Sequence, residues 1–270
     1  MGYLFLSLSL LSSLTIAVIL KVFELKNYDR VVVIASNYIT ATALGFALSR
    51  PSDMGRGVIP FAVITGLLFF STFVVYSFVI KKDGIAPAVT FGRISMAIPV
   101  IVSIIFWGER PEILNWLGLG AVFWVVLTWE GKINRLSSSL LALFLLSGSI
   151  STSMKFFKVK FPVVDEGKFL VFLFASALVW SWAYIFITER KVKLPFLLGG
   201  LFIGIPNFFS SYFLLKALTE VPAYISFPFI SVNLIVLSSL AGYLFFSEKL
   251  SRRKLLLIIL AAAGVGLLSV

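Results

Sequence analysis

The chain has 270 residues, of which 60% are hydrophobic, and a formal net charge of +11. This apolar share is well above that of soluble domains, so the composition predicts a polytopic membrane protein. The absence of cysteine and histidine excludes a disulfide framework, thiolate metal sites and the commonest general base. Because the basic residues lie mainly at the ends of apolar runs, the positive charge indicates anchoring at lipid headgroups and not nucleic-acid binding.

Ten apolar stretches are long enough, at about 17–25 residues, to cross a hydrocarbon core of roughly 30 Å. They are 3–23, 31–49, 58–80, 85–107, 113–129, 139–157, 167–188, 194–215, 221–246 and 254–270. The first stretch has no basic residue before it and no small-residue cleavage site after it, so we expect a retained helix and not a signal peptide. The connections are short and rich in turn and charged residues. The sequence therefore predicts an all-α membrane protein with ten transmembrane helices and no soluble domain.

Two spans resemble each other and contain internal prolines. One runs from Pro87 to Glu109 and the other from Pro222 to Glu248, and each begins Pro-Ala and ends with a glutamate. A proline inside an apolar helix frees a backbone carbonyl that lipid cannot satisfy, so such helices are expected to line a cavity. The stretch 194–215 contains three glycines before Pro206, and a break is predicted there as well.

A duplication of the chain explains this resemblance. Landmarks recur in the same order at a nearly constant separation: Lys21 and Lys155 (134 residues), Lys81 and Lys216 (135), Pro87 and Pro222 (135), and Glu109 and Glu248 (139). The alternative is that Lys, Pro and Glu recur at helix ends by general membrane rules. The duplication predicts two five-helix repeats, 1–136 and 137–270, within one integral membrane unit. Because five is odd, the second repeat enters the membrane from the opposite side, which is the inverted topology typical of transporters.

Parts of the chain also carry a family resemblance. The segment NWLGLGAVFWVVLTW after residues 108–110, the ending FFSEKLSRRKLLLIILAAAGVGLLS and the duplication resemble the ten-helix, EamA-like branch of the drug/metabolite transporter superfamily. Glu109 with Gly118 and Gly120, and Glu248 with Gly264 and Gly266, match the family's pattern of a glutamate followed by a glycine-containing helix. The resemblance implies a central cavity and transport by alternating access. Asn37 and Tyr38 stand where many members have an arginine, so those members' substrates do not carry over.

Arg93 is the strongest candidate for a substrate-binding residue. It lies eight residues beyond the start of its span, which at 1.5 Å per residue is roughly 12 Å into a core of about 30 Å. Insertion of an arginine near a helix centre costs about 2.5–3.5 kcal/mol on the mildest scale, which favours a wet cavity or a partner. The alternative is an arginine that snorkels along its own helix or binds a freed carbonyl.

Seven further residues are candidates, each with a structural alternative. Lys21 and Lys155 could hold an anionic group or snorkel from helix ends. Asn37, Asn207 and Asn233 could bind a substrate or form interhelical hydrogen bonds. Tyr38 and Tyr212 could line the site or only pack.

All twelve carboxylates lie at or beyond the ends of the spans. An exporter of cations would ordinarily use a buried carboxylate, so the interior of Arg, Lys, Asn, Ser and Tyr suits an anionic or zwitterionic metabolite. The sequence thus predicts a secondary transporter in the plasma (inner) membrane, with a small molecule and the lipid bilayer as partners. We expect no catalytic residues, metal or cofactor. The alternatives are a membrane scaffold or receptor, or a membrane-embedded enzyme, for which paired interior carboxylates are missing.

The orientation of the chain is left open by two conflicting signals. Loops on the side opposite the termini are richer in basic residues, and the positive-inside rule therefore places both termini outside. The family resemblance implies that both termini are cytoplasmic.

Overall fold

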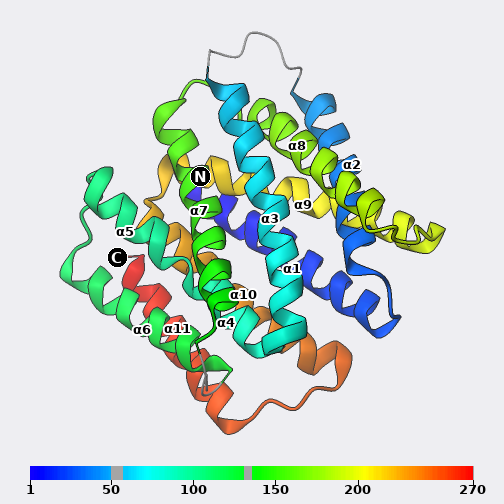
Figure 1. The fold of residues 1–270 in the computed structure, drawn as a ribbon. Coiled ribbons are helices and arrows are strands. Elements are labelled where there is room, and N and C mark those ends of the chain that lie inside the picture. Colours follow the sequence, from blue (N-terminus) through cyan, green and yellow to red (C-terminus); the bar gives the residue numbers. More distant parts are fainter. Residues whose placement is uncertain (50–56, 131–135, 270) are drawn as a thin grey trace. The chain divides into compact units, whose positions relative to one another are not determined.

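The structure is a computed structural model that describes residues 1–49, 57–130 and 136–269. Within these ranges all regular secondary structure is helical (Figure 1). The helices are α1 (Gly2–Leu25), α2 (Arg30–Leu48), α3 (Val58–Asp83), α4 (Ile85–Ile94), α5 (Ala97–Phe106), α6 (Ile113–Trp129), α7 (Ser138–Lys160), α8 (Glu166–Ile187), α9 (Leu194–Glu220), α10 (Ala223–Phe246) and α11 (Arg252–Leu268). The predicted all-α fold is confirmed, and the described helices number ten when α4 and α5 are counted as one. Residue 270, the predicted end of the last span, lies outside the described residues.

Eight of these spans are long and apolar enough to cross a membrane, counting Ile85–Phe106 as one span, and α6 is a shorter apolar helix of 17 residues. The apolar stretches therefore form the multi-pass membrane architecture that the composition predicts. Their lengths of 19 to 27 residues match a hydrocarbon core of roughly 30 Å at 1.5 Å per residue.

The prolines explain where one span breaks and another does not. Pro99 is the third residue of α5, where a missing N–H costs nothing because first-turn N–H groups have no partner within a helix. The span stops at Ile94 and restarts at Ala97, which keeps the Pro99 ring away from the carbonyl four residues earlier. The break expected at Pro206 is absent, because α9 continues through it. The chain tolerates this proline inside the helix, as it also tolerates Pro228 inside α10.

The chain divides into two compact units, and each unit takes helices from both sequence halves. Unit 1 contains Tyr3–Ser71 and Lys160–Ala217, and unit 2 contains Thr72–Val159 and Leu218–Val270. Unit 1 thus holds α2 and α8 with most of α1 and α9 and the first part of α3. Unit 2 holds α4, α5, α6, α10 and α11 with nearly all of α7 and the rest of α3.

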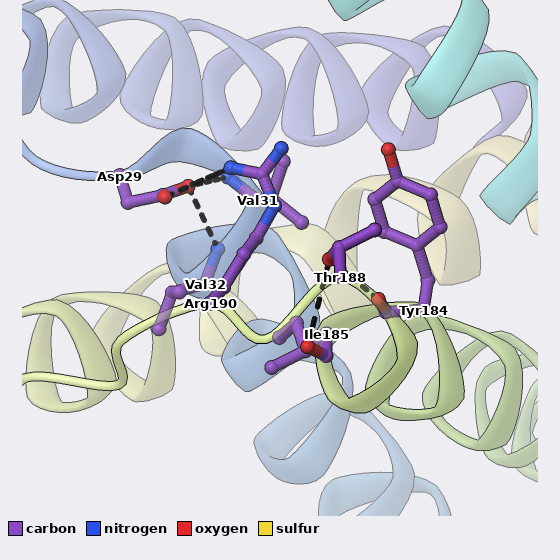
Figure 2. A network of polar contacts seen from close by, with 7 residues as sticks. All are labelled: Asp29, Val31, Val32, Tyr184, Ile185, Thr188 and Arg190. Atoms are coloured by element: carbon purple, nitrogen blue, oxygen red, sulfur yellow. Dashed lines mark hydrogen bonds and ion pairs between the residues drawn. The ribbon is translucent and has the colours of Figure 1, made fainter.

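In unit 1, α2 and α8 pack side by side and run antiparallel, since each helix start contacts the other's end (Figure 1). Asp29 caps the start of α2 and accepts two hydrogen bonds, of 2.9 and 3.2 Å, from the guanidinium of Arg190, just after α8 (Figure 2). At the opposite ends, Asp165 caps the start of α8 and accepts a 2.5 Å hydrogen bond from Ser49, the C-cap of α2. Each aspartate therefore caps its own helix and binds its partner's end.

Two further helices of unit 1 approach this pair through glycines. A side-chain carbon on Gly200 of α9 would lie 2.2 Å from the carbonyl oxygen of Val33 on α2. A side-chain carbon on Gly66 of α3 would lie 2.2 Å from the carbonyl oxygen of Leu173 on α8. Only glycine permits approaches this close, so α9 packs on α2 in the same manner as α3 packs on α8.

Unit 2 contains a second antiparallel pair, formed by α6 and α11. Near the start of α6, Asn115 donates to the carbonyls of Leu267 and Leu268 in the last turn of α11, at 3.2 and 3.4 Å. Near the start of α11, Arg253 donates to the carbonyl of Thr128 in the last turn of α6. The Asn115 amide thereby satisfies carbonyls of the last turn of α11, which lack a helical partner of their own.

The middle of this second pair is closed by Gly118 and Gly264. A side-chain carbon on Gly118 would lie 2.8 Å from the carbonyl oxygen of Gly264, and one on Gly264 would lie 3.3 Å from that of Gly118. Around the pair, α10 packs against α5, α6 and α11, and α4 packs against α6. The cluster formed by α3, α4 and α7 completes the unit, with Val79, Ala88, Leu140 and Leu143 at its centre.

Candidate functional site

Arg93 lies in the last turn of α4, directly before the break between α4 and α5. The backbone of the break is satisfied locally: the Ser95 hydroxyl donates to the Gly92 carbonyl at 2.7 Å, and the Met96 N–H donates to the Arg93 carbonyl at 3.2 Å. A cation at this place is favoured by the partial negative charge of a helix C-terminus. The break therefore positions a guanidinium inside an apolar span without using it to repair the backbone.

The surroundings of Arg93 in unit 2 contain an aromatic side chain but no bound carboxylate. Tyr76 of α3 packs beside Gly92, where an added side-chain carbon would be 3.6 Å from the tyrosine ring. Arg93 itself is half-buried, and no other described residue forms a hydrogen bond or an ion pair with its guanidinium. A half-buried charge without a protein counter-ion is costly, and a bound anion would relieve that cost.

The structure brings together two of the predicted polar residues of unit 1, Asn37 and Asn207. The Asn207 amide donates a 2.6 Å hydrogen bond to the Asn37 side-chain oxygen, and the Asn37 amide donates to the carbonyl of Ile34. Asn37 is 3% exposed, whereas Asn207 is half-buried. This bond is the interhelical contact that the sequence offered as an alternative, and it joins α2 to α9 close to Gly204.

The two predicted tyrosines of unit 1 lie among phenylalanines. Tyr38 is buried, and its ring stacks on Phe174 with centroids 6.0 Å apart. The Tyr212 ring stacks on Phe208 with centroids 5.7 Å apart, and the Lys216 ammonium lies over this ring, 4.9 Å from its centroid. The position of Lys216 four residues after Tyr212 is the sequence signal that could have predicted this cation–π contact.

Lys155 is bound to a carboxylate. Its ammonium lies 2.9 Å from a carboxylate oxygen of Glu109, and it also donates to the Leu218 carbonyl at 3.3 Å. The same carboxylate accepts hydrogen bonds from the N–H groups of Ala223 and Tyr224 at the start of α10. The sequence singled out Lys155 and Glu109 separately and did not pair them, because a turn and a helix 46 residues apart in the sequence give no local signal of contact.

The remaining two candidates lie on separate helices. Asn233 of α10 is half-buried and donates to the Phe229 carbonyl of its own helix at 2.8 Å. Lys21 lies in the last part of α1 and is also half-buried. Their roles in substrate binding stay predictions.

Comparisons with known proteins find one similar sequence and a similar solved fold. No protein-family model matches the chain. A Haemophilus influenzae (strain Rd) protein described only as uncharacterized is 23% identical over 276 residues, covering 95% of this chain and 94% of its own length. A solved crystal structure, whose description names no function, superposes with a TM-score of 0.79 at 17% identity, over 99% of this chain and 96% of its own. This likeness establishes that a known protein shares the helical fold along nearly the full length.

Proposed function

We propose that the chain is a secondary transporter of the plasma membrane that moves a small anionic or zwitterionic metabolite by alternating access. The observation that carries the proposal is Arg93, a half-buried guanidinium in an interrupted span, for which the described residues provide no counter-ion. A membrane protein rarely retains such a charge without a function. A carboxylate or phosphate group of a substrate would act as the counter-ion of Arg93 and form a bidentate contact with its guanidinium.

We further propose that the ten spans form two inverted five-helix repeats, as in the EamA-like branch of the drug/metabolite transporter superfamily. In the duplication α2 corresponds to α8, and α6 corresponds to α11. Corresponding helices of inverted repeats run in opposite directions, and both pairs are antiparallel with contacts at both ends. Asp29 and Asp165, which cap α2 and α8, are 136 residues apart, close to the spacing of the other landmarks.

The packing of α3 and α9 supports the same arrangement. These helices correspond in the duplication, and Gly66 and Gly200 are 134 residues apart. Each glycine meets a backbone carbonyl and then a serine three residues further along the neighbouring helix: Leu173 and Ser176 for Gly66, and Val33 and Ser36 for Gly200. A two-fold axis relating α2 to α8 would produce this repetition.

The test of the transport function starts from purified protein and a library of amino acids, organic acids and phosphorylated compounds. A ligand that stabilises the protein is identified by its melting temperature, because a ligand at 100 times its dissociation constant adds about 2.7 kcal/mol. Counterflow of the labelled ligand in liposomes then measures transport. A receptor or scaffold would bind the ligand without counterflow, and a library without any ligand would count against both functions.

Arg93→Ala should weaken binding of that ligand about ten- to hundredfold, because a hydrogen bond to a charged group contributes roughly 1.5–3 kcal/mol. Arg93→Lys should recover only part of the affinity, since a point ammonium cannot replace a guanidinium fork. Arg252→Ala, which removes the same charge from an exposed position on α11, is the matched control and should bind normally. Unchanged affinity in Arg93→Ala together with a large fall in melting temperature would show that Arg93 is structural.

A further inference from the structure

The turn between α5 and α6 is fastened to the start of α10 through Glu109. One carboxylate oxygen accepts a hydrogen bond of 2.9 Å from the Ala223 N–H, and the other accepts one of 3.2 Å from the Tyr224 N–H. These N–H groups belong to the first turn of α10, which carries a partial positive charge. Glu109 therefore caps a helix that begins 114 residues later in the chain.

Lys155 of α7 completes this contact as an ion pair. Its ammonium lies 2.9 Å from the Glu109 carboxylate, and each side chain is only 11% exposed. Its further bond to the Leu218 carbonyl reaches the last turn of α9. We call Glu109, Lys155 and the first turn of α10 the Glu109 latch. Its contacts join the α5–α6 turn, α7, α10 and the end of α9.

The cap of α10 differs from the caps of α2, α8 and α11. Asp29, Asp165 and Ser251 each cap the helix that immediately follows them, and such caps hold regardless of what the rest of the chain does. The residue before α10 is Pro222, which provides no side-chain cap. The N–H groups of Ala223 and Tyr224 are thus satisfied only while the α5–α6 turn is docked, and they lose their partners if the turn leaves.

We propose that the Glu109 latch closes one end of the transport path, and that its release opens that end. The proposal rests on the transport function proposed above. The two spans that the latch joins, α4–α5 at its end and α10 at its start, are the proline-containing counterparts in the duplication.

Cysteine labelling tests the latch directly, because the chain contains no cysteine. Ala223 is fully buried where Glu109 binds, so the reaction of an Ala223→Cys thiol with N-ethylmaleimide reports release of the turn. Glu109→Gln and Lys155→Met each remove one partner of a desolvated pair, and each should raise the labelling rate at least about tenfold. Glu112→Gln is the matched control: this carboxylate is exposed and caps α6, so the labelling rate should not change.

A second probe separates opening of the latch from general loosening. Ala261 on α11 of the same unit is 2% exposed. The labelling rate of an Ala261→Cys thiol should therefore stay constant in every variant. Equal acceleration at both probes, or no acceleration at Ala223→Cys, would overturn the latch. If a single variant does not fold, the double variant Glu109→Gln with Lys155→Met, which leaves no unpaired buried charge, is labelled instead. The assay needs no substrate, so its failure is distinguishable from a failure of the Arg93 binding test.

Discussion

The two antiparallel pairs, α2–α8 in unit 1 and α6–α11 in unit 2, achieve the same arrangement with different chemistry. The ends of α2–α8 are closed by aspartates that bind a side chain of the partner, Arg190 or Ser49. The ends of α6–α11 are closed by Asn115 and Arg253, which donate to backbone carbonyls. The unpaired groups at helix ends thus have to be satisfied, while the side chain that does so is free to change. Charge should therefore contribute more to the contact between Asp29 and Arg190 than to the contact between Asn115 and the end of α11.

The largest effect is expected from Gly118→Val in unit 2. The added carbon would lie 2.8 Å from the carbonyl oxygen of Gly264, so α6 and α11 would have to separate. Overpacking of this kind typically costs up to about 3 kcal/mol, and the melting temperature should fall by roughly 6–12 °C. The control is Gly120→Val on the same helix, which meets no atom within 4 Å and should melt like the parent. Equal losses in both variants would mean that helix propensity, and not the contact with Gly264, decides the outcome.

Asp29→Ala should have the next largest effect, because it removes both the cap of α2 and the contact with Arg190. A lost cap costs about 1 kcal/mol, and a partly exposed ion pair adds up to about 1 kcal/mol more. A double-mutant cycle with Arg190→Ala measures the second contribution through the melting temperature. Strictly additive losses would show that the pair in Figure 2 contributes nothing to stability.

Asn115→Ala should cost somewhat less, about 1–1.5 kcal/mol, since it removes neutral hydrogen bonds to the last turn of α11. Salt concentration should distinguish the stability loss of Asn115→Ala from that of Asp29→Ala. At 1 M salt the Debye length is about 3 Å, so the loss caused by Asp29→Ala should shrink while that of Asn115→Ala stays constant. Melting curves of both variants at low and high salt provide the measurement, and equal salt dependence would contradict the proposed difference between these two contacts.

The sequence predicts the spans well but predicts little of how they pack. Long apolar runs with charged ends identify helices directly, and α6 begins and ends where the pattern places it. The pairing of α2 with α8 was not predicted, because in a membrane chain nearly every face of a helix is apolar and no hydrophobic stripe marks the packed one. The break after Ile94 and the continuity at Pro206 depend on whether neighbouring helices can satisfy the freed carbonyl, which is a property of the packed structure.

The candidate site was predictable only in part, for a related reason. Arg93 stands out in the sequence because a charge inside an apolar run is costly wherever the helix packs. Asn37, Asn207 and Lys155 are recognisable as polar residues, but their partners lie on helices far away in the sequence. The spacing of residues along the sequence does not predict contacts of this kind.

The long separation of the paired helix ends has a consequence for biosynthesis. Asp29 and Arg190 are 161 residues apart, and Asn115 and Leu268 are 153 residues apart. At a synthesis rate of about 5–20 residues per second, the end of α8 is made roughly 8–30 s after the start of α2. During that time local caps can satisfy its first turn, but Ser49 and Asp29 have no partner helix. We therefore expect the nascent chain to depend on insertion machinery or lipid to shield these ends until the second half of the chain has been made.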